Sequence, residues 1–171
     1  TAEQIAAIFE KDGWINRERF LSLAADGAFI RQFGLDVSHL EGYLFPETYT
    51  LVRNETNEET VVRMVVDRFR QVWKELEIPA NIQLNQHQLL TLASVVEKET
   101  GVASERPLIA RVFYNRLAKK MRLQSDPTVI YGIRDFNGNL TRADLKRETP
   151  YNTYVIPALP PGPICSPGRA S

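Results

Sequence analysis

The 171-residue sequence predicts an α+β protein that is rich in helix, with a small antiparallel sheet and a proline-rich C-terminal loop. Three observations support this fold class. Apolar residues recur at helical spacing through most of the first 120 residues. Asn137-Gly138 is a hairpin-turn signal between short extended segments. Six of the ten prolines fall between residues 150 and 167, which excludes a helix or a central strand there.

Five helices are expected, over residues 2–11, 16–25, 57–77, 85–100 and 104–120. Asn16 and Ser104 are suitable N-caps for the second and the fifth. A short extended segment is expected at 49–52, and a final helical turn near Thr141. We expect residues 1–84 to form an N-terminal helical part and residues 85–171 to form the core that carries the chemistry.

The composition limits the class of protein. With 21 Lys+Arg against 21 Asp+Glu, the net charge is zero, whereas a dedicated nucleic-acid binder usually has a basic excess. One cysteine, Cys165, excludes an internal disulfide framework. Two histidines, His39 and His87, do not make a zinc-ligand cluster, so neither a metal nor a cofactor is predicted. No run approaches the roughly 18 apolar residues of a membrane helix.

The two ends of the sequence predict a fragment. Thr1 to Ile5 read as the start of a helix and not as a natural initiation site, and 166–171 stop without closing an element. We therefore expect a membrane anchor or an export signal to lie outside this stretch.

The helix at 85–100 carries two glutamates, Glu97 and Glu99, on opposite flanks of an apolar face that includes Leu92 and Val96. Either one can be half-buried at the edge of a core. A half-buried glutamate suits general-acid catalysis because desolvation raises its pKa from about 4.3 toward 6–7. Two solvated surface acids are the alternative, and the spacing does not choose between Glu97 and Glu99.

Two further stretches concentrate polar side chains. Residues 124–128 offer amide and hydroxyl groups around a proline, and 151–154 place Asn-Thr between two tyrosines whose flat faces suit sugar rings. Turn capping and packing over a sheet are the structural alternatives. Residues 103–122 carry six basic side chains against one acid, which is either a solvated face or a rim facing an anionic polymer.

Six segments occur in the order found in one family: EGYLFPETY at 41–49, ASVVEKETG at 93–101, RVFYNRL at 111–117, MRLQSDPTVIYG at 121–132, TPYNTY at 149–154 and LPPGPI at 159–164. The sequence resembles the YceG-like endolytic murein transglycosylases, bacterial enzymes that cut nascent peptidoglycan glycan strands. The resemblance implies non-hydrolytic cleavage between N-acetylmuramic acid and N-acetylglucosamine, with a 1,6-anhydro product. It also implies that the catalytic domain is cut short at its C-terminal end in this sequence.

The resemblance assigns the catalytic acid to Glu99, with Glu97 and Glu47 in supporting roles. It implies a single-pass membrane protein whose catalytic domain faces the outer side, with penicillin-binding proteins and other wall-synthesis proteins as partners. Motif position and residue chemistry together predict substrate binding by Asn115, Gln124, Ser125, Asp126, Thr128, Tyr151, Asn152, Thr153 and Tyr154.

Two other functions are compatible with the same residues. One is a muramidase-type hydrolase that pairs Glu99 with a second carboxylate, Asp126 or Glu47, across a cleft. The other is a non-catalytic glycan-binding scaffold for wall synthases.

Overall fold

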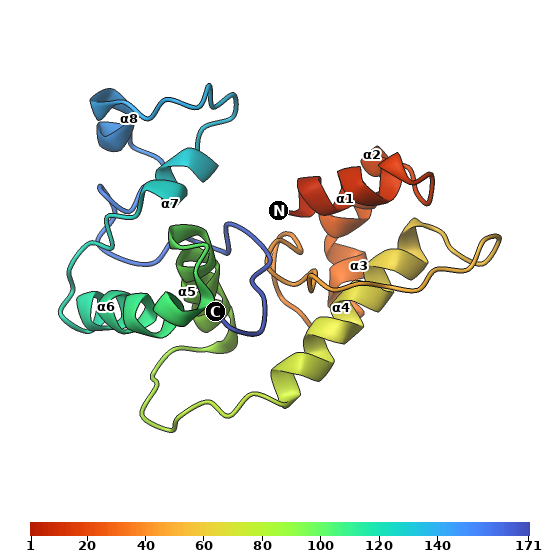
Figure 1. Cartoon of the computed structure of the whole chain (residues 1–171), viewed down its shortest axis with the longest axis horizontal. Helices are drawn as coiled ribbons and strands as arrows, with labels where there is room; N and C mark the ends of the chain where they lie inside the picture. The colour runs from red at the N-terminus through yellow and green to blue at the C-terminus, as the bar shows by residue number, and fades with distance from the viewer. The chain divides into compact units, whose positions relative to one another are not determined.

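All regular secondary structure in the fold is helical, as seen in a computed structural model that describes residues 1–171 (Figure 1). The chain divides into two compact units, Thr1–Ile82 and Gln83–Ser171. No residue lies in a β-strand. The helix-rich part of the prediction is confirmed, and the predicted antiparallel sheet is wrong.

The sheet fails because its two expected segments find no partner strand. Gly138 has a φ of 88°, and the Asn137 side chain accepts a hydrogen bond from the Asn139 N–H at 3.0 Å, so Asn137-Gly138 forms a local turn. The segment at 49–52 leads into another turn at Asn54, whose φ is 72°. Extended segments this short are not stable unless they pair within a larger sheet.

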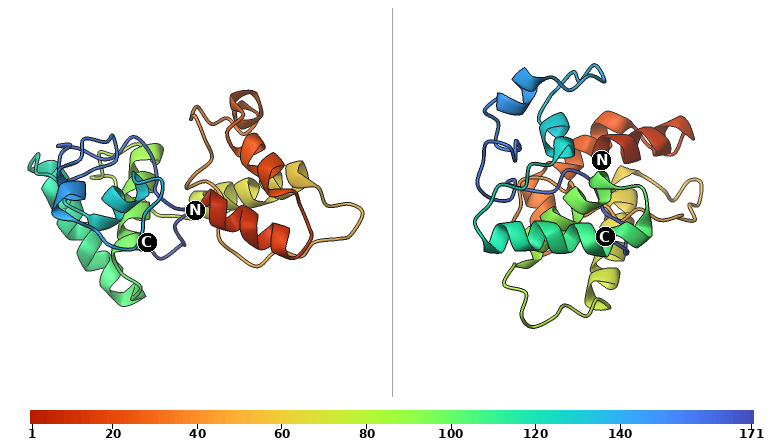
Figure 2. Two further views of the ribbon diagram at one scale, coloured as in Figure 1. Left: turned by 90° about the horizontal axis from the view of Figure 1, so that it is seen from above. Right: turned by 60° about the vertical axis from the view of Figure 1, so that its left-hand side comes forward.

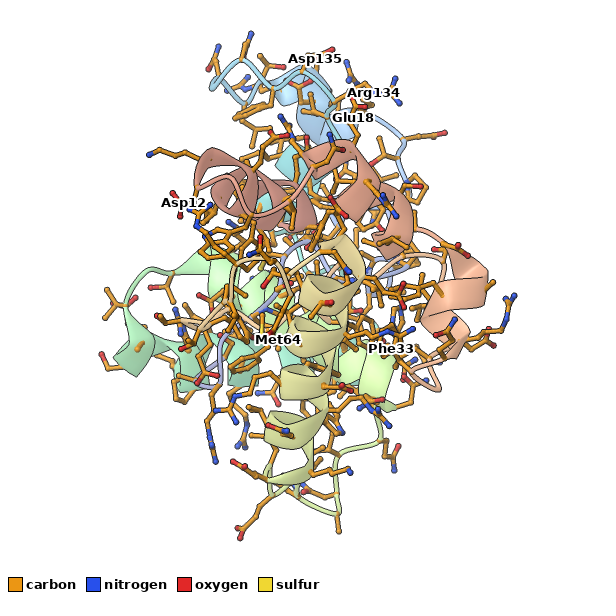
Figure 3. The ribbon with its side chains drawn as sticks, turned by 90° about the vertical axis from the view of Figure 1, so that its right-hand side faces the viewer. Asp12, Glu18, Phe33, Met64, Arg134 and Asp135 are labelled. Atoms are coloured by element: carbon orange, nitrogen blue, oxygen red, sulfur yellow. The ribbon has the colours of Figure 1, made fainter.

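The first unit contains α1 (Ala2–Lys11), α2 (Arg17–Ala24), α3 (Gly27–Arg31) and α4 (Glu58–Lys74). Each begins at a polar side chain that accepts hydrogen bonds from its first turn. Asn16 caps α2 as predicted. The longest of the four, α4, packs against α2, and Figure 3 labels Met64 on α4. The buried face of α4 consists of Val61, Val62, Val65, Val66, Phe69 and Val72.

The EGYLFPETY segment is built into this first unit. Glu41 is buried, and both of its carboxylate oxygens accept the Ala2 N–H, at 3.1 and 3.0 Å, at the start of α1. Tyr43 packs edge-on against Phe69 with ring centroids 5.1 Å apart. Its burial raises the pKa of Tyr43 to about 12. The residues that mark this segment therefore stabilise the N-terminal helices.

The second unit contains α5 (Gln86–Glu99), the 3₁₀ turn η1 (Ala103–Glu105), α6 (Arg106–Ala118), α7 (Asp126–Tyr131) and α8 (Arg142–Lys146). α5 packs against both α6 and α7, and α7 contacts α8 (Figure 2). The expected helix at 104–120 divides into η1 and α6, so Ser104 is not its N-cap. The core consists of Leu92, Val95, Val96, Phe113, Leu123 and Ile164.

The proline-rich segment is a loop, as predicted, and it covers the core of the second unit. Ile164 and Cys165 are buried, and the Ile164 N–H donates to the Ser94 hydroxyl on α5 at 3.0 Å. The His87 ring contacts the Pro161 carbonyl at 2.8 Å. These contacts hold the loop against α5 along much of the helix.

Candidate functional site

The end of α5 brings Glu99 to the surface of the second unit. Glu99 is the last residue of the helix, and its side chain is exposed. Its Oε2 accepts a hydrogen bond from the Ser125 hydroxyl at 2.7 Å. Ser125 is fully buried directly ahead of α7, so an exposed carboxylate is held by a donor from the protein interior.

A closed ring of hydrogen bonds fixes the backbone of Ser125. The Ser125 N–H donates to Thr153 Oγ1 at 3.0 Å, and Thr128 Oγ1 donates to the Ser125 carbonyl at 2.7 Å. The two threonine hydroxyls lie 2.8 Å apart. Because Thr128 uses its proton on the Ser125 carbonyl, Thr153 donates in this bond. All three residues are fully buried, so water does not compete with the ring.

Gln124 turns the chain into this ring. It has a φ of 53°, in the left-handed region that a residue with a side chain enters at a cost of about 1–3 kcal/mol. Its N–H donates to the Thr153 carbonyl at 3.1 Å, which compensates part of that cost. The turn leaves the Gln124 side chain exposed while the next residue is buried.

The Asn152 amide is used within the protein. Asn152 is fully buried, and its Nδ2 donates to the carbonyls of Asp144, Leu145 and Arg147 at 3.3, 3.1 and 2.7 Å. It therefore satisfies the C-terminal carbonyls of α8. Its Oδ1 accepts the Tyr154 N–H at 2.9 Å, which links α8 to the residues beside Glu99.

Tyr154 and Asp126 form a hydrogen-bonded pair that is partly exposed. The Tyr154 hydroxyl donates to Asp126 Oδ1 at 2.6 Å. This bond, followed by burial and the negative charges of Asp126 and Glu99, raises the pKa of Tyr154 to about 12. The Arg116 charge acts in the opposite direction. Tyr154 is thus neutral at physiological pH and lies in the field of Glu99.

Glu97 has different partners from Glu99. It is half-buried, and its Oε1 accepts from Arg106 Nη2 at 2.9 Å. Its Oε2 accepts from the Gly168 N–H at 3.2 Å and from the Ser171 hydroxyl. The glutamate with the partly desolvated side chain is therefore engaged in an ion pair, and the exposed one is available to a ligand.

The structure joins four of the ten predicted catalytic and substrate-binding residues in one hydrogen-bonded cluster, which contains Glu99, Ser125, Thr128 and Thr153. Asp126 and Tyr154 form a separate hydrogen-bonded pair. Gln124 attaches to the cluster through Thr153, and Asn152 attaches to the pair through Tyr154. The Tyr151 ring packs at a tilt against Tyr131, with ring centroids 4.8 Å apart, and Asn115 is exposed on α6. Substrate contact by the fully buried members stays a prediction.

Glu47 belongs to the first unit, where Arg68 Nη2 donates to its Oε1 at 2.9 Å. That pairing lowers the pKa of Glu47.

Two cations beside the site, Arg106 and Arg116, were not singled out from the sequence. Both belong to a run of six basic residues, and only the structure shows that Arg106 pairs with Glu97 while Arg116 donates to the Leu123 carbonyl.

No group of three or more His, Cys, Asp or Glu side chains is placed to hold a metal ion. None of the helices combines the length and the apolar character that a membrane span requires.

The profile of the YceG-like family matches residues 1–171. The chain belongs to the YceG-like family. It is 35% identical to the endolytic murein transglycosylase of Bacillus subtilis over 98% of this chain and 51% of that protein. It is 38% identical to the endolytic murein transglycosylase of Streptococcus pneumoniae over 75% of this chain and 24% of that protein.

The fold also matches a solved relative. The crystal structure of a putative YceG-like protein from Listeria monocytogenes superposes with a TM-score of 0.80 at 33% identity, covering 98% of this chain and 60% of that one. This YceG-like chain spans about half the length of the Bacillus subtilis relative.

Replacing Thr128 by valine should destabilise the second unit by about 1–3 kcal/mol, because the Ser125 carbonyl loses a buried donor and Thr153 loses an acceptor. Thermal unfolding followed by circular dichroism measures the change. Thr50→Val, at an exposed position, is the control and should lie within about 0.5 kcal/mol of the parent. Equal stabilities for the two variants would show that the ring does not stabilise the fold.

Replacing Glu97 by alanine should lower the free energy of unfolding by about 1–3 kcal/mol, because the half-buried Arg106 loses its charged partner. Chemical denaturation gives the difference in the free energy of unfolding. Glu148→Ala, an exposed glutamate of the same unit, should be nearly neutral. A neutral Glu97→Ala would mean that water replaces the ion pair without loss.

Replacing Asp126 by asparagine should lower the pKa of Tyr154 from about 12 toward 10, because the charged acceptor is lost. The folded-state pKa is above the unfolded value, so Tyr154 contributes stability that is complete below about pH 10 and is lost as the pH rises to about 12. Ultraviolet titration of tyrosinate should show one group moving to lower pH. Asp135→Asn is the control and should leave the curve unchanged.

Proposed function

We propose that this chain carries the catalytic centre of an endolytic murein transglycosylase, with Glu99 as its acid and then its base. The observation that carries the proposal is the exposed Glu99 carboxylate held by the buried Ser125 hydroxyl at 2.7 Å. A catalytic acid must be open to its substrate and fixed in direction, and this arrangement provides both. Relatives of similar sequence carry the name of this activity.

In the proposed reaction, Glu99 begins as the carboxylic acid and protonates the glycosidic oxygen that leaves N-acetylmuramic acid. Positive charge develops at the muramic anomeric carbon as that bond breaks. The Glu99 carboxylate then removes the proton from the C6 hydroxyl of the same sugar, whose oxygen attacks the anomeric carbon and closes the 1,6-anhydro ring. The nucleophile is intramolecular, so no second carboxylate is needed to position a water. The muramic N-acetyl group can assist.

The other carboxylates near α5 and α7 already have partners. Glu97 pairs with Arg106, and Asp126 accepts the Tyr154 hydroxyl. Glu99 has one donor on one oxygen, which leaves its other oxygen for the substrate. These contacts favour a reaction with a single catalytic acid over a muramidase that pairs Glu99 with Asp126.

The exposed polar groups around Glu99 are the proposed sugar contacts. Gln124 and Asp126 are exposed and Tyr154 is half-buried, so their polar ends can reach glycan hydroxyl and amide groups. Tyr154 presents a neutral phenol because its pKa is about 12. A glycan strand is the proposed partner, and the proposed place of action is the outer side of the bacterial cytoplasmic membrane, alongside the wall synthases.

Glu99→Gln should lower the rate of strand cleavage by roughly 10²–10⁴-fold, because the amide cannot donate a proton and then accept one. Uncrosslinked glycan strands are incubated with the protein and the products are weighed by mass spectrometry. Anhydro-muramic ends are lighter than hydrolytic ends by one water. Glu148→Gln is the matched control at an exposed site and should cut like the parent.

Products that carry only hydrated ends would replace the transglycosylase with a muramidase. Cleavage by Glu99→Gln at the parent rate would remove Glu99 from the mechanism. Binding of strands without cleavage by the parent would favour a glycan-binding scaffold.

A further inference from the structure

The two oxygens of Glu99 have different surroundings. Oε2 accepts the Ser125 hydroxyl proton at 2.7 Å, on the side of the carboxylate that faces the protein. Oε1 accepts no hydrogen bond from the protein, and the Glu99 side chain is exposed. The carboxylate is therefore held by one oxygen and open at the other.

The Ser125 hydroxyl is free for this single task. The ring that fixes Ser125 uses its backbone N–H, bonded to Thr153, and its backbone carbonyl, bonded to Thr128. Its side chain takes no part in that ring. Because Ser125 is fully buried, its hydroxyl is shielded from bulk water and from a ligand that approaches Glu99 at the surface.

We propose that Ser125 is a positioning residue that binds Oε2 of Glu99 and thereby makes Oε1 the oxygen that carries and transfers the proton. The inference rests on the proposed function and assigns Ser125 a role other than substrate binding. A protonated Oε2 would compete with the Ser125 proton for the same short contact, whereas a proton on Oε1 faces the open side. Donation to Oε2 is compatible with both the acid and the carboxylate form of Glu99.

The proton balance is the following. The Oε1–H bond breaks as an O–H bond forms on the glycosidic oxygen and the anomeric C–O bond cleaves. Oε1 then takes the proton of the C6 hydroxyl as the new C–O bond closes the anhydro ring. Ser125 keeps its proton in both steps, and Glu99 ends as the acid with which it began.

Glu99, the Asp126 carboxylate on α7 and the Arg116 guanidinium on α6 all act on the pKa of Tyr154, whose hydroxyl is bonded to Asp126. On α5 itself Lys98 is exposed and Glu97 is paired with Arg106. Ser125→Ala changes none of these groups and keeps the backbone ring, so its effect reports the lost hydroxyl alone.

The test compares Ser125→Ala with the matched control Ser104→Ala, an exposed serine in η1. For strand cleavage by the 171-residue chain, we expect Ser125→Ala to lower kcat roughly ten- to a hundredfold with little change in KM. Because the Ser125 hydroxyl orients Glu99 and touches no substrate, the loss falls on kcat and not on KM. Ser104→Ala should match the parent in both constants.

A second readout does not depend on cleavage. In NMR spectra of protein with labelled glutamate, the chemical shift of the Glu99 carboxyl carbon should change in Ser125→Ala, because Oε2 loses its hydrogen bond, and should stay in place in Ser104→Ala. An unchanged chemical shift, or an unchanged kcat, would overturn the positioning role. If the parent does not cut strands while the chemical shift changes, the proposed activity fails and the Ser125–Glu99 contact stands.

Discussion

The hydrogen bond from the Ser125 hydroxyl to Glu99 Oε2 is the contact on which the site depends. It joins the last residue of α5 to the residue that precedes α7. The end of a helix is otherwise a poor place for a directed side chain, because the terminal turn frays and lacks further intrahelical bonds. The contact fixes Glu99 only because Ser125 is itself fixed by the buried threonine ring.

The same ring explains why the polar residues of this region divide into two groups. Ser125, Thr128, Asn152 and Thr153 are fully buried and satisfy one another or nearby carbonyls, as buried polar groups must. Gln124, Asp126 and Tyr154 retain contact with solvent. The buried group stabilises the loop around α7, and the exposed group is left to meet a ligand. Residue type alone does not separate the two groups.

Three glutamates from the family segments have three different environments. Glu41 is buried and accepts the first N–H of α1, where a carboxylate is favoured by the helix dipole. Glu97 pairs with Arg106 and accepts the Gly168 N–H. Glu99 alone combines an exposed side chain with a buried donor. The chemistry assigned to each follows from these partners.

The sequence by itself determined most of the helices, because apolar residues that recur every 3.6 residues after a polar N-cap are buried on one face only when the segment is helical. The cap at Asn16, the final helical turn near Thr141 and the proline-rich loop were predicted from the sequence. The predicted sheet was wrong, because Asn137-Gly138 makes the same turn whether or not strands pair beyond it. The six-residue α7 was also missed, because Ser-Asp-Pro begins turns as well as helices.

The resemblance to the YceG-like family singled out Glu99, but the helical periodicity alone left Glu97 and Glu99 equivalent. The tertiary structure gives the two glutamates different partners, which lie 9 and 26 residues away along the chain and meet α5 only after packing.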